Sequence, residues 1–147
     1  MSSFELIPAI GISNSGLAAE RKRMDVIANN LANANSTGTK NEVYKKKLTV
    51  FESNVNEELA AQQESQADSL AGVKLAKIVD SNKEPISQYM PYHPKADKDG
   101  MVYTPNISVI EEMVDMIAAT RAYEANLSVI KESRTMANST INLMSAK

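Results

Sequence analysis

Three carboxylates in the C-terminal part of the chain come nearest to a pattern that could do chemistry. Glu111, Glu112 and Asp115 could act as general acid and base, or hold a metal ion, if they faced one another. Acidic residues in the first turns of a helix also complement the helix dipole, and this role accounts for all three. We therefore interpret the cluster as a helix start and predict no catalytic site there.

The other candidate for metal or acid-base chemistry is His93, the only histidine of a chain that has no cysteine. A histidine metal site or a Ser-His-Asp triad would lack its usual partners, so we interpret His93 as structural or solvent-exposed. Asp97, Asp99 and Gly100 are similar to the start of a calcium loop, but the later ligands are missing, which predicts a turn. The sequence predicts no metal site, no cofactor and no enzymatic activity.

Composition gives no reason to expect a nucleic-acid partner. Sixteen Lys and Arg against 18 Asp and Glu leave a net charge of -2, so there is no basic excess to bind phosphates. The only basic run is Lys45, Lys46 and Lys47, which we interpret as the solvated edge of a strand or loop. With two Phe, no Trp and eight Met, the chain suits long helices that pack on partners better than a globular core.

The N-terminal residues 1–13 lack the early positive charge and the long apolar stretch of a cleavable secretory signal. No segment approaches the roughly 18 apolar residues that a membrane span requires. We therefore expect no direct membrane insertion. A role outside the cytoplasm would require another export route.

Apolar residues at seven-residue intervals predict a helix over residues 9–35. Residues 35–38, with Gly38 last, are expected to end it. Residues 106–147 contain neither Gly nor Pro and predict a second helix, which at about 1.5 Å per residue reaches roughly 60 Å. Asn106 is its expected N-cap. A second apolar stripe near its start predicts contact with more than one neighbour and consists of Ile107, Ile110, Val114 and Ile117.

The sequence between these helices predicts short strands separated by polar segments. The β-prone pieces are residues 43–44, 48–51, 72–79 and 85–90. Residues 80–83 predict a hairpin turn, and residues 57–69 predict a loop. Residues 92–106, with three Pro and Gly positions, predict an extended connector.

The predicted fold is mainly α with a small β-containing middle region, and the two long terminal helices form an antiparallel coiled-coil-like hairpin. The expected segments are residues 1–38 and 106–147, which supply the helices, and the middle region 39–105. Antiparallel alignment of the heptads places Leu31 beside Met113 and Leu17 beside Leu127. It leaves the last turns free for adjacent subunits, through Ala137, Ile141 and Met144.

Two parts of the sequence resemble signatures of the flagellar rod and hook family. Residues 28–38 (ANNLANANSTG) closely resemble its N-terminal signature. Residues 112–116 (EMVDM) and 121–126 (RAYEAN) resemble its C-terminal signature. The connector at residues 94–106 is similar to that of the proximal rod members, and the short middle region excludes the longer distal rod and hook proteins. One departure is Thr39, where many members have an aromatic residue.

The resemblance implies a structural subunit of the bacterial flagellar basal-body rod, which polymerises through its terminal helices into a hollow drive shaft. It implies a place in the periplasmic space and export by the flagellar type III apparatus without a cleavable signal peptide. The expected partners are other copies of the chain and neighbouring rod proteins. The alternative is a soluble coiled-coil adaptor or chaperone that does not polymerise. Membrane binding by the first helix is a weaker idea, because Glu20 and Asp25 interrupt its basic face.

The residues expected at helix–helix and subunit interfaces are heptad positions and asparagines. Asparagine on a packed helix is costly unless it is hydrogen-bonded, so these asparagines are candidates for fixing register between chains; the alternative is that they face water. The expected set is Ile10, Leu17, Met24, Ile27, Asn29, Asn30, Leu31, Asn33, Val109, Met113, Met116, Tyr123, Asn126, Leu127, Ile130, Ala137, Ile141 and Met144.

Overall fold

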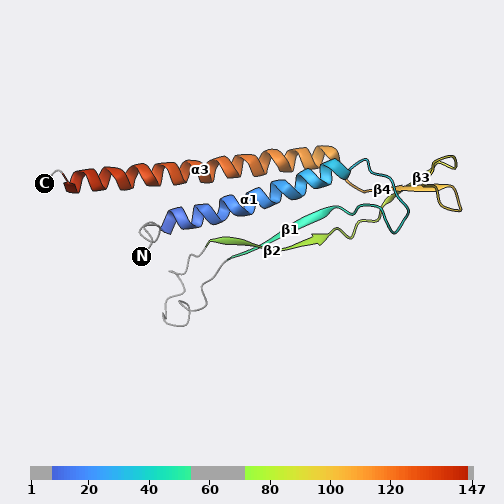
Figure 1. Ribbon diagram of the computed structural model, residues 1–147, viewed down its shortest axis with the longest axis horizontal. Helices are drawn as coiled ribbons and strands as arrows, with labels where there is room; N and C mark the ends of the chain where they lie inside the picture. Colours follow the sequence, from blue (N-terminus) through green and yellow to red (C-terminus); the bar gives the residue numbers. More distant parts are fainter. Residues whose placement is uncertain (1–7, 54–71, 146–147) are drawn as a thin grey trace, which may run out of the picture. The chain divides into compact units, whose positions relative to one another are not determined.

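The computed structural model describes residues 8–53 and 72–145 (Figure 1). The fold is mainly α with a small β-containing middle region, as predicted. The predicted loop at residues 57–69 lies outside the described residues. The elements are α1 (Pro8–Asn33), β1 (Lys47–Ser53), β2 (Val73–Asp80), β3 (Ile86–Tyr89), β4 (Met101–Thr104) and α3 (Val109–Ser145). Within the described ranges, no helix is both long and apolar enough to cross a membrane.

The chain divides into two compact units, and each contains part of both helices. Of the described residues, unit 1 contains 8–22, 51–53, 72–76 and 119–145, and unit 2 contains Arg23–Val50 and Lys77–Ala118. The division into residues 1–38, 39–105 and 106–147 stays a prediction.

Strand pairing in unit 2 differs from the prediction at two points. β3 pairs antiparallel with β4, from Ile86 opposite Thr104 to Tyr89 opposite Met101, so part of the predicted connector is a strand. The predicted hairpin turn at residues 80–83 is wrong, because β2 pairs with β1 and not with β3. The polar residues there end β2, and the Ser81 amide donates to the Lys46 carbonyl at 2.7 Å.

The helix ends also differ from the sequence prediction. α1 ends at Asn33, and Gly38 instead pairs with Tyr103 of β4 through two backbone hydrogen bonds of 3.0 and 3.1 Å. Asn106 is not the N-cap of α3, because its Nδ2 donates to the Glu84 carbonyl at 3.2 Å. Ser108 takes the capping position, and its Oγ accepts from the Glu111 amide at 3.4 Å.

The core of unit 2 combines small and medium apolar side chains with two buried polar groups. The buried apolar residues are Val26, Ile27, Ala34, Val43 and Val102. Asn30 and Glu112 are each only 1% exposed, and with Val102 they are the largest side chains that are almost fully buried in the described residues. A buried amide and carboxylate persist only with hydrogen-bonded partners, so their contacts decide how this unit is held together.

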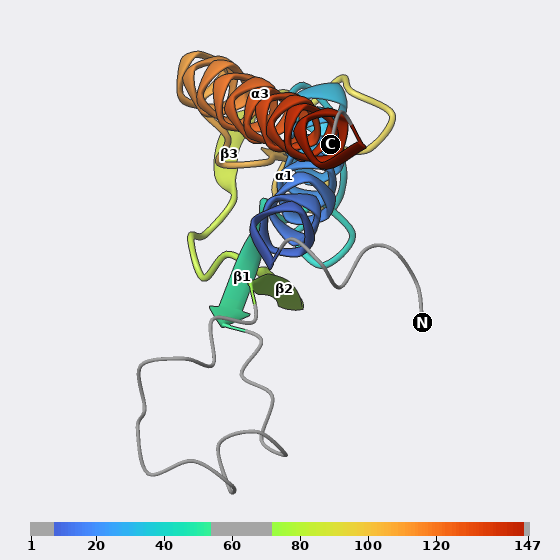
Figure 2. The same ribbon diagram turned by 90° about the vertical axis from the view of Figure 1, so that its left-hand side faces the viewer.

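Unit 1 is held by close approach of small residues. The start of α1 and the later turns of α3 lie side by side in Figures 1 and 2. A Cβ added at Gly16 of α1 would lie 3.0 Å from Asn126 Nδ2 of α3, so glycine allows this approach. The Val73 amide of β2 donates to Ser15 Oγ at 3.0 Å. Gly72 has φ +84° and packs directly on Ser15, where a side chain would clash.

The inward face of α3 is rotated from the predicted seam. Met116, Tyr123 and Ile130 are half-buried, as one predicted heptad line requires, but Met113 and Leu127 of the other line are 53% and 52% exposed. The residues found inward instead are one position earlier and are smaller or polar: Glu112, Ala119 and Asn126. Small side chains let two helix backbones approach closely, so the larger aliphatic residues are left on the outer face.

Candidate functional site

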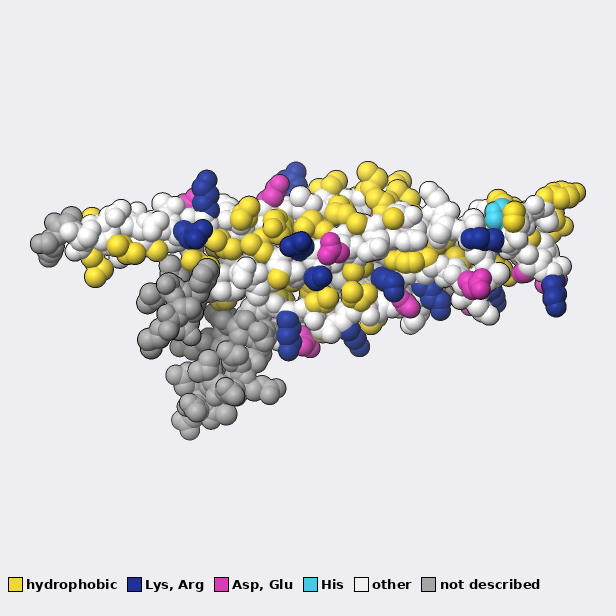
Figure 3. Space-filling view, viewed as in Figure 1, with side chains coloured by type: hydrophobic (Ala, Val, Ile, Leu, Met, Phe, Trp, Pro, Cys, Tyr) yellow, Lys and Arg dark blue, Asp and Glu magenta, His cyan; other side chains and the backbone are white. Residues whose placement is uncertain are grey.

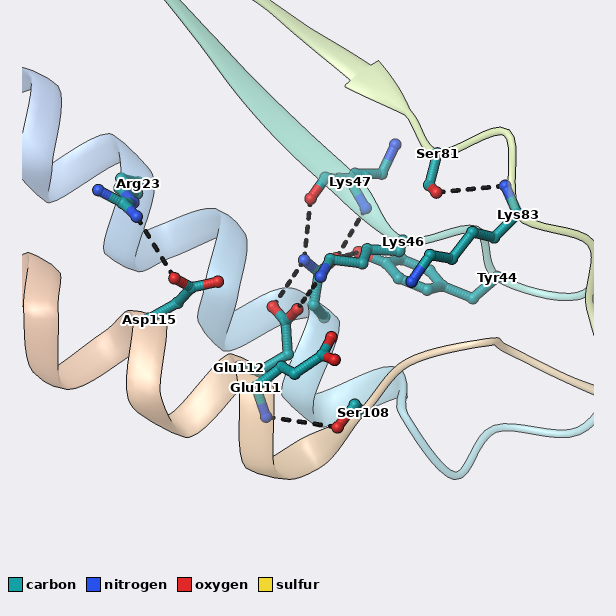
Figure 4. A network of polar contacts seen from close by, with 11 residues as sticks. Arg23, Tyr44, Lys46, Lys47, Ser81, Lys83, Ser108, Glu111, Glu112 and Asp115 are labelled. Carbon is teal, nitrogen blue, oxygen red and sulfur yellow. Dashed lines mark hydrogen bonds and ion pairs between the residues drawn. The ribbon is translucent and has the colours of Figure 1, made fainter.

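A polar centre in unit 2 consists of the side chains of Asn30, Tyr44, Lys46 and Glu112 and the backbone of Lys47 (Figure 4). We call it the Asn30 centre. The Asn30 Nδ2 donates to the Lys47 carbonyl and to Glu112 Oε2, both at 2.9 Å. The Asn30 Oδ1 accepts from the Lys47 amide and from the Tyr44 hydroxyl, also at 2.9 Å. A side-chain amide has two N–H donors and two acceptor lone pairs, so every hydrogen-bonding position of Asn30 is used.

Lys46 completes the centre by neutralising Glu112. Its Nζ lies 2.7 Å from Glu112 Oε1, and its side chain is 15% exposed. The interpretation of the lysine run as a solvated edge is therefore wrong for Lys46. Successive residues of an extended chain point to opposite sides, so Lys46 faces the centre while Lys47 Nζ meets Asp80 at 3.4 Å. Lys45 is exposed, as predicted.

The three carboxylates at the start of α3 have different environments. Glu111 is exposed, Asp115 lies 3.5 Å from Arg23 of α1, and Glu112 is buried in the Asn30 centre. The dipole role predicted for all three is therefore incomplete, because it misses the tertiary partners of Glu112 and Asp115. Their arrangement positions α3 against α1 within unit 2. It does not leave an open carboxylate pair for acid-base chemistry.

The Tyr44 hydroxyl is held as a donor by its surroundings. Burial raises the pKa of Tyr44 above its ordinary value, and the negative charges of Asp80 and Glu112 raise it further. The phenol therefore keeps its proton and donates to Asn30 throughout the neutral range. The predicted strand at residues 43–44 is wrong, because β1 begins at Lys47, and the sequence analysis missed this role of Tyr44.

A stripe of exposed aliphatic side chains runs along the first turns of α3. The α3 stripe, as we call it, consists of Ile110, Met113, Val114 and Ile117, which are between 53% and 76% exposed. Figure 3 shows hydrophobic side chains gathered over this part of the helix. Spacing of three and four residues places all four on one face, opposite the inward residues Glu112 and Ala119. Ile110, Val114 and Ile117 belong to the second apolar stripe predicted from the sequence, and Met113 belongs to the expected interface set.

Comparison with known proteins identifies the family. Residues 10–40 match the family model described as flagella basal body rod protein, and residues 98–143 match the C-terminal model of the flagellar basal body rod FlgEFG proteins. The flagellar basal-body rod protein FlgC of Salmonella typhimurium is 35% identical over 139 residues, 94% of this chain and 97% of that protein. The chain belongs to the flagellar basal-body rod protein family.

Two further relatives support the assignment to a FlgC-like rod protein. FlgC of Borreliella burgdorferi is 37% identical over 150 residues, 95% of this chain and 97% of that protein. FlgC of Bacillus subtilis is 32% identical over 136 residues, 87% and 91% of the two chains. As a member of the rod family, the chain is a structural subunit of the flagellar basal-body rod and not an enzyme.

The asparagines of the rod signatures occupy different environments. The Nδ2 groups of Asn29 and Asn33 donate hydrogen bonds to the carbonyls four residues earlier on the same helix. Asn29 donates to Asp25 at 2.8 Å, and Asn33 donates to Asn29 at 2.9 Å. Asn126 does the same with Ala122 at 3.0 Å and also lies over Gly16. Asn30 alone of the N-terminal trio is buried and makes its bonds to β1 and α3. The asparagines of the rod signature therefore have two distinct roles: some bond within their own helix, and Asn30 bonds to other elements.

The apolar residues of the expected interface set also divide. Ile27 is buried, and half-buried positions are Ile10, Leu17, Met24, Met116, Tyr123, Ile130 and Ala137. The exposed members lie mainly on the outer face or toward the end of α3: Leu31, Val109, Met113, Leu127, Ile141 and Met144. The structure thus assigns some of the set to packing within the chain and leaves others open to solvent.

The turn between β3 and β4 confirms the interpretation of its aspartates. Asp97 Oδ1 accepts from the amides of Asp99 and Met101 at 2.9 and 2.8 Å, and Oδ2 accepts from the Tyr103 hydroxyl at 3.3 Å. The Met101 amide is the largest cause of the lowered pKa of Asp97, and the other two donors act in the same direction. His93 Nδ1 accepts from the Lys95 amide at 3.1 Å, which is a structural role in the same turn. No metal-holding group of acidic or His side chains is found in the described parts of the rod protein.

Proposed function

We propose that this rod subunit polymerises with copies of itself and with neighbouring rod proteins through helix faces that its own fold leaves uncovered. The observation that carries this proposal is the α3 stripe. Contiguous exposed apolar patches of roughly 300–600 Å² are often functional on soluble proteins, because water contact with them is unfavourable. The stripe is uncharged and lies on a regular helix, so a second helix could pack along it.

The size of the stripe favours a polymer over an isolated dimer. Four partly exposed aliphatic side chains offer well under the roughly 800 Å² that each partner contributes to a stable pairwise interface. A subunit in a helical polymer makes several such contacts at once, and their sum holds it in place. The last turns of α3 supply further exposed apolar residues: Met136, Ile141, Leu143 and Met144.

We further propose that the terminal helices form an antiparallel coiled-coil-like hairpin in the assembled rod. Two contacts in unit 2 support it, Asn30 with Glu112 and Arg23 with Asp115. In unit 1, the approach of Asn126 to Gly16 supports it and lies one residue from the predicted pairing of Leu17 with Leu127. In this arrangement the two terminal helices form the inner layer of the tube, with the middle region 39–105 outside it.

The proposed location is the proximal rod in the periplasmic space, reached through the flagellar type III export apparatus. Support comes from the assignment of the chain to the flagellar basal-body rod family. Secretion can be tested directly. In cells that lack a working type III export gate, the chain should accumulate in the cytoplasm, and appearance in the periplasm would contradict the proposed route.

Substitution on the α3 stripe tests polymerisation. Val114→Asp places on the stripe a charge that must lose water in a packed interface, and we expect loss of assembly with neighbouring rod proteins and loss of motility. Ala118→Asp is the matched control, because it adds the same charge at an exposed position about 90° around the helix from the middle of the stripe. Sedimentation of the purified chain with rod partners gives the result. Complexes of fixed small stoichiometry for the unaltered chain would favour an adaptor or chaperone instead.

A further inference from the structure

We propose that Asn30 is a positioning residue within the single chain, which orders unit 2 before assembly and affects polymerisation only through that order. The part that concerns polymerisation rests on the proposed function. The contrary view is that the signature asparagines hydrogen-bond between subunits and set the register of the polymer. The geometry of the Asn30 centre separates the two.

The hydrogen-bonding capacity of Asn30 is exhausted inside unit 2. Both Nδ2 hydrogens and both Oδ1 lone pairs have partners at 2.9 Å, and the residue is 1% exposed. A bond to another subunit would require one of these four to break inside a buried site. Asn29, the adjacent residue, is exposed, and its Nδ2 donates to the Asp25 carbonyl of its own helix, so the two neighbours face different environments.

Asn30 also helps to set the register of β1 on α1, which the three consecutive lysines cannot set by themselves. A slip of one residue would still leave a lysine opposite Glu112, because residues 45–47 are all lysine. Asn30 bonds to the backbone N–H and C=O of Lys47 as a strand partner would, and these groups carry no residue identity. The Tyr44 hydroxyl, bonded to the same Oδ1, fixes which residue occupies that place. The Asn30 and Tyr44 side chains together therefore set the register of β1 on α1.

The same side chain couples β1 to the start of α3. Glu112 receives a hydrogen bond from Asn30 and an ion pair from Lys46, and it lies on the face of α3 opposite the α3 stripe. Without these partners the buried carboxylate would have to reach water, which would rotate or unwind the first turns of the helix. Asn30 thus holds the stripe residues in one orientation while making no contact with a partner subunit.

Hydrogen exchange of the isolated chain tests the ordering role directly. The Lys47 amide donates to Asn30 Oδ1, so its exchange rate reports on the centre. In Asn30→Ala we expect exchange at Lys47 and at residues 112–118 to rise on the order of ten- to a hundredfold, because a buried polar group loses its partners. Asn29→Ala is the matched control and should leave these rates within about twofold. Equal rates in the two variants would overturn the proposal.

A milder variant keeps the test valid if Asn30→Ala unfolds the unit. Tyr44→Phe removes one of the four bonds of Asn30 and keeps the ring, so exchange at Lys47 should rise roughly three- to tenfold while the Gly38 and Tyr103 amides stay protected. No change at Lys47 would count against the proposal.

Sedimentation of the same variants with rod partners tests the second step. Asn30→Ala should lose both exchange protection and assembly. If Asn30→Ala loses assembly but keeps normal exchange protection, Asn30 acts between subunits and the proposal is overturned. If it loses protection but still assembles, the claim that polymerisation requires the order of unit 2 is overturned. If even the unaltered chain fails to polymerise, the proposed function fails while the exchange result still decides the role of Asn30.

Discussion

Unit 2 and unit 1 are both built from parts of the same two helices, but they close their interiors in different ways. Unit 2 buries five apolar side chains around Asn30 and Glu112, whose polar groups are bonded to one another and to β1. The described part of unit 1 buries only Ser13, Ala19 and Ala119. Small residues permit close helix contact but bury little apolar area, so they contribute little stability in a single chain. We infer that unit 2 is ordered alone and that unit 1 depends on neighbours.

The largest effect is expected from removing the buried charge of unit 2. Glu112→Ala leaves Lys46 and Asn30 without their buried partner and should lower the free energy of unfolding by about 3 kcal/mol. Glu111→Ala, at the exposed neighbouring position, should cost well under about 1 kcal/mol. Urea unfolding followed by tyrosine fluorescence gives both values. If the two variants lose a similar amount of unfolding free energy, the claim that the buried polar groups of unit 2 stabilise it within the single chain is contradicted.

A pair of apolar truncations compares the units directly. Val102→Ala in unit 2 removes a side chain that is 1% exposed and should destabilise the isolated chain by about 2 kcal/mol. Leu127→Ala in unit 1 changes a side chain that is 52% exposed and should cost less than about 0.5 kcal/mol in the same assay. A larger cost at Leu127 than at Val102 would reverse the comparison.

The smallest predicted effect is a decrease in the stability of unit 2 at alkaline pH. The pKa of Tyr44 is raised in the folded chain, so the unfolded chain loses this proton first as the pH rises. The contribution of protonated Tyr44 to the free energy of unfolding is complete below the pKa of about 10 in the unfolded chain. It is lost as the pH rises through the higher pKa in the folded chain. Tyr44→Phe should therefore flatten the fall of unfolding free energy above about pH 10. Tyr89→Phe, at a side chain that is 70% exposed, is the control and should leave the slope unchanged.

Local patterns in the sequence predicted most of the secondary structure. Heptad patterns predicted both helices, and β-prone runs predicted β1, β2 and β3 within a few residues. β4 was missed because it has four residues between Gly100 and Pro105, and its strand character depends on pairing with β3 and Gly38. The capping role of Ser108 was missed because Asn106 is an equally good cap by type and is instead bonded to Glu84.

The site was harder to predict because its partners are distant in the sequence. Asn30 and Glu112 are 82 positions apart, and nothing local distinguishes Asn30 from Asn29 or Glu112 from Glu111. Likewise, α3 carries apolar residues on two faces. The apolar pattern alone does not show which face packs within the chain, because the inward face includes Glu112 and Ala119 while larger aliphatic residues stay exposed.

Hydrogen exchange of the unaltered chain, alone and assembled with rod partners, tests the central claim most directly. We expect residues 23–50 and 77–118 to be protected in both states, and residues 8–22 and 119–145 to gain strong protection only on assembly. This result would show that unit 2 is ordered in the isolated rod subunit and that unit 1 becomes ordered only when it packs on neighbouring subunits. Strong protection of residues 8–22 and 119–145 in the dilute isolated chain would contradict the account.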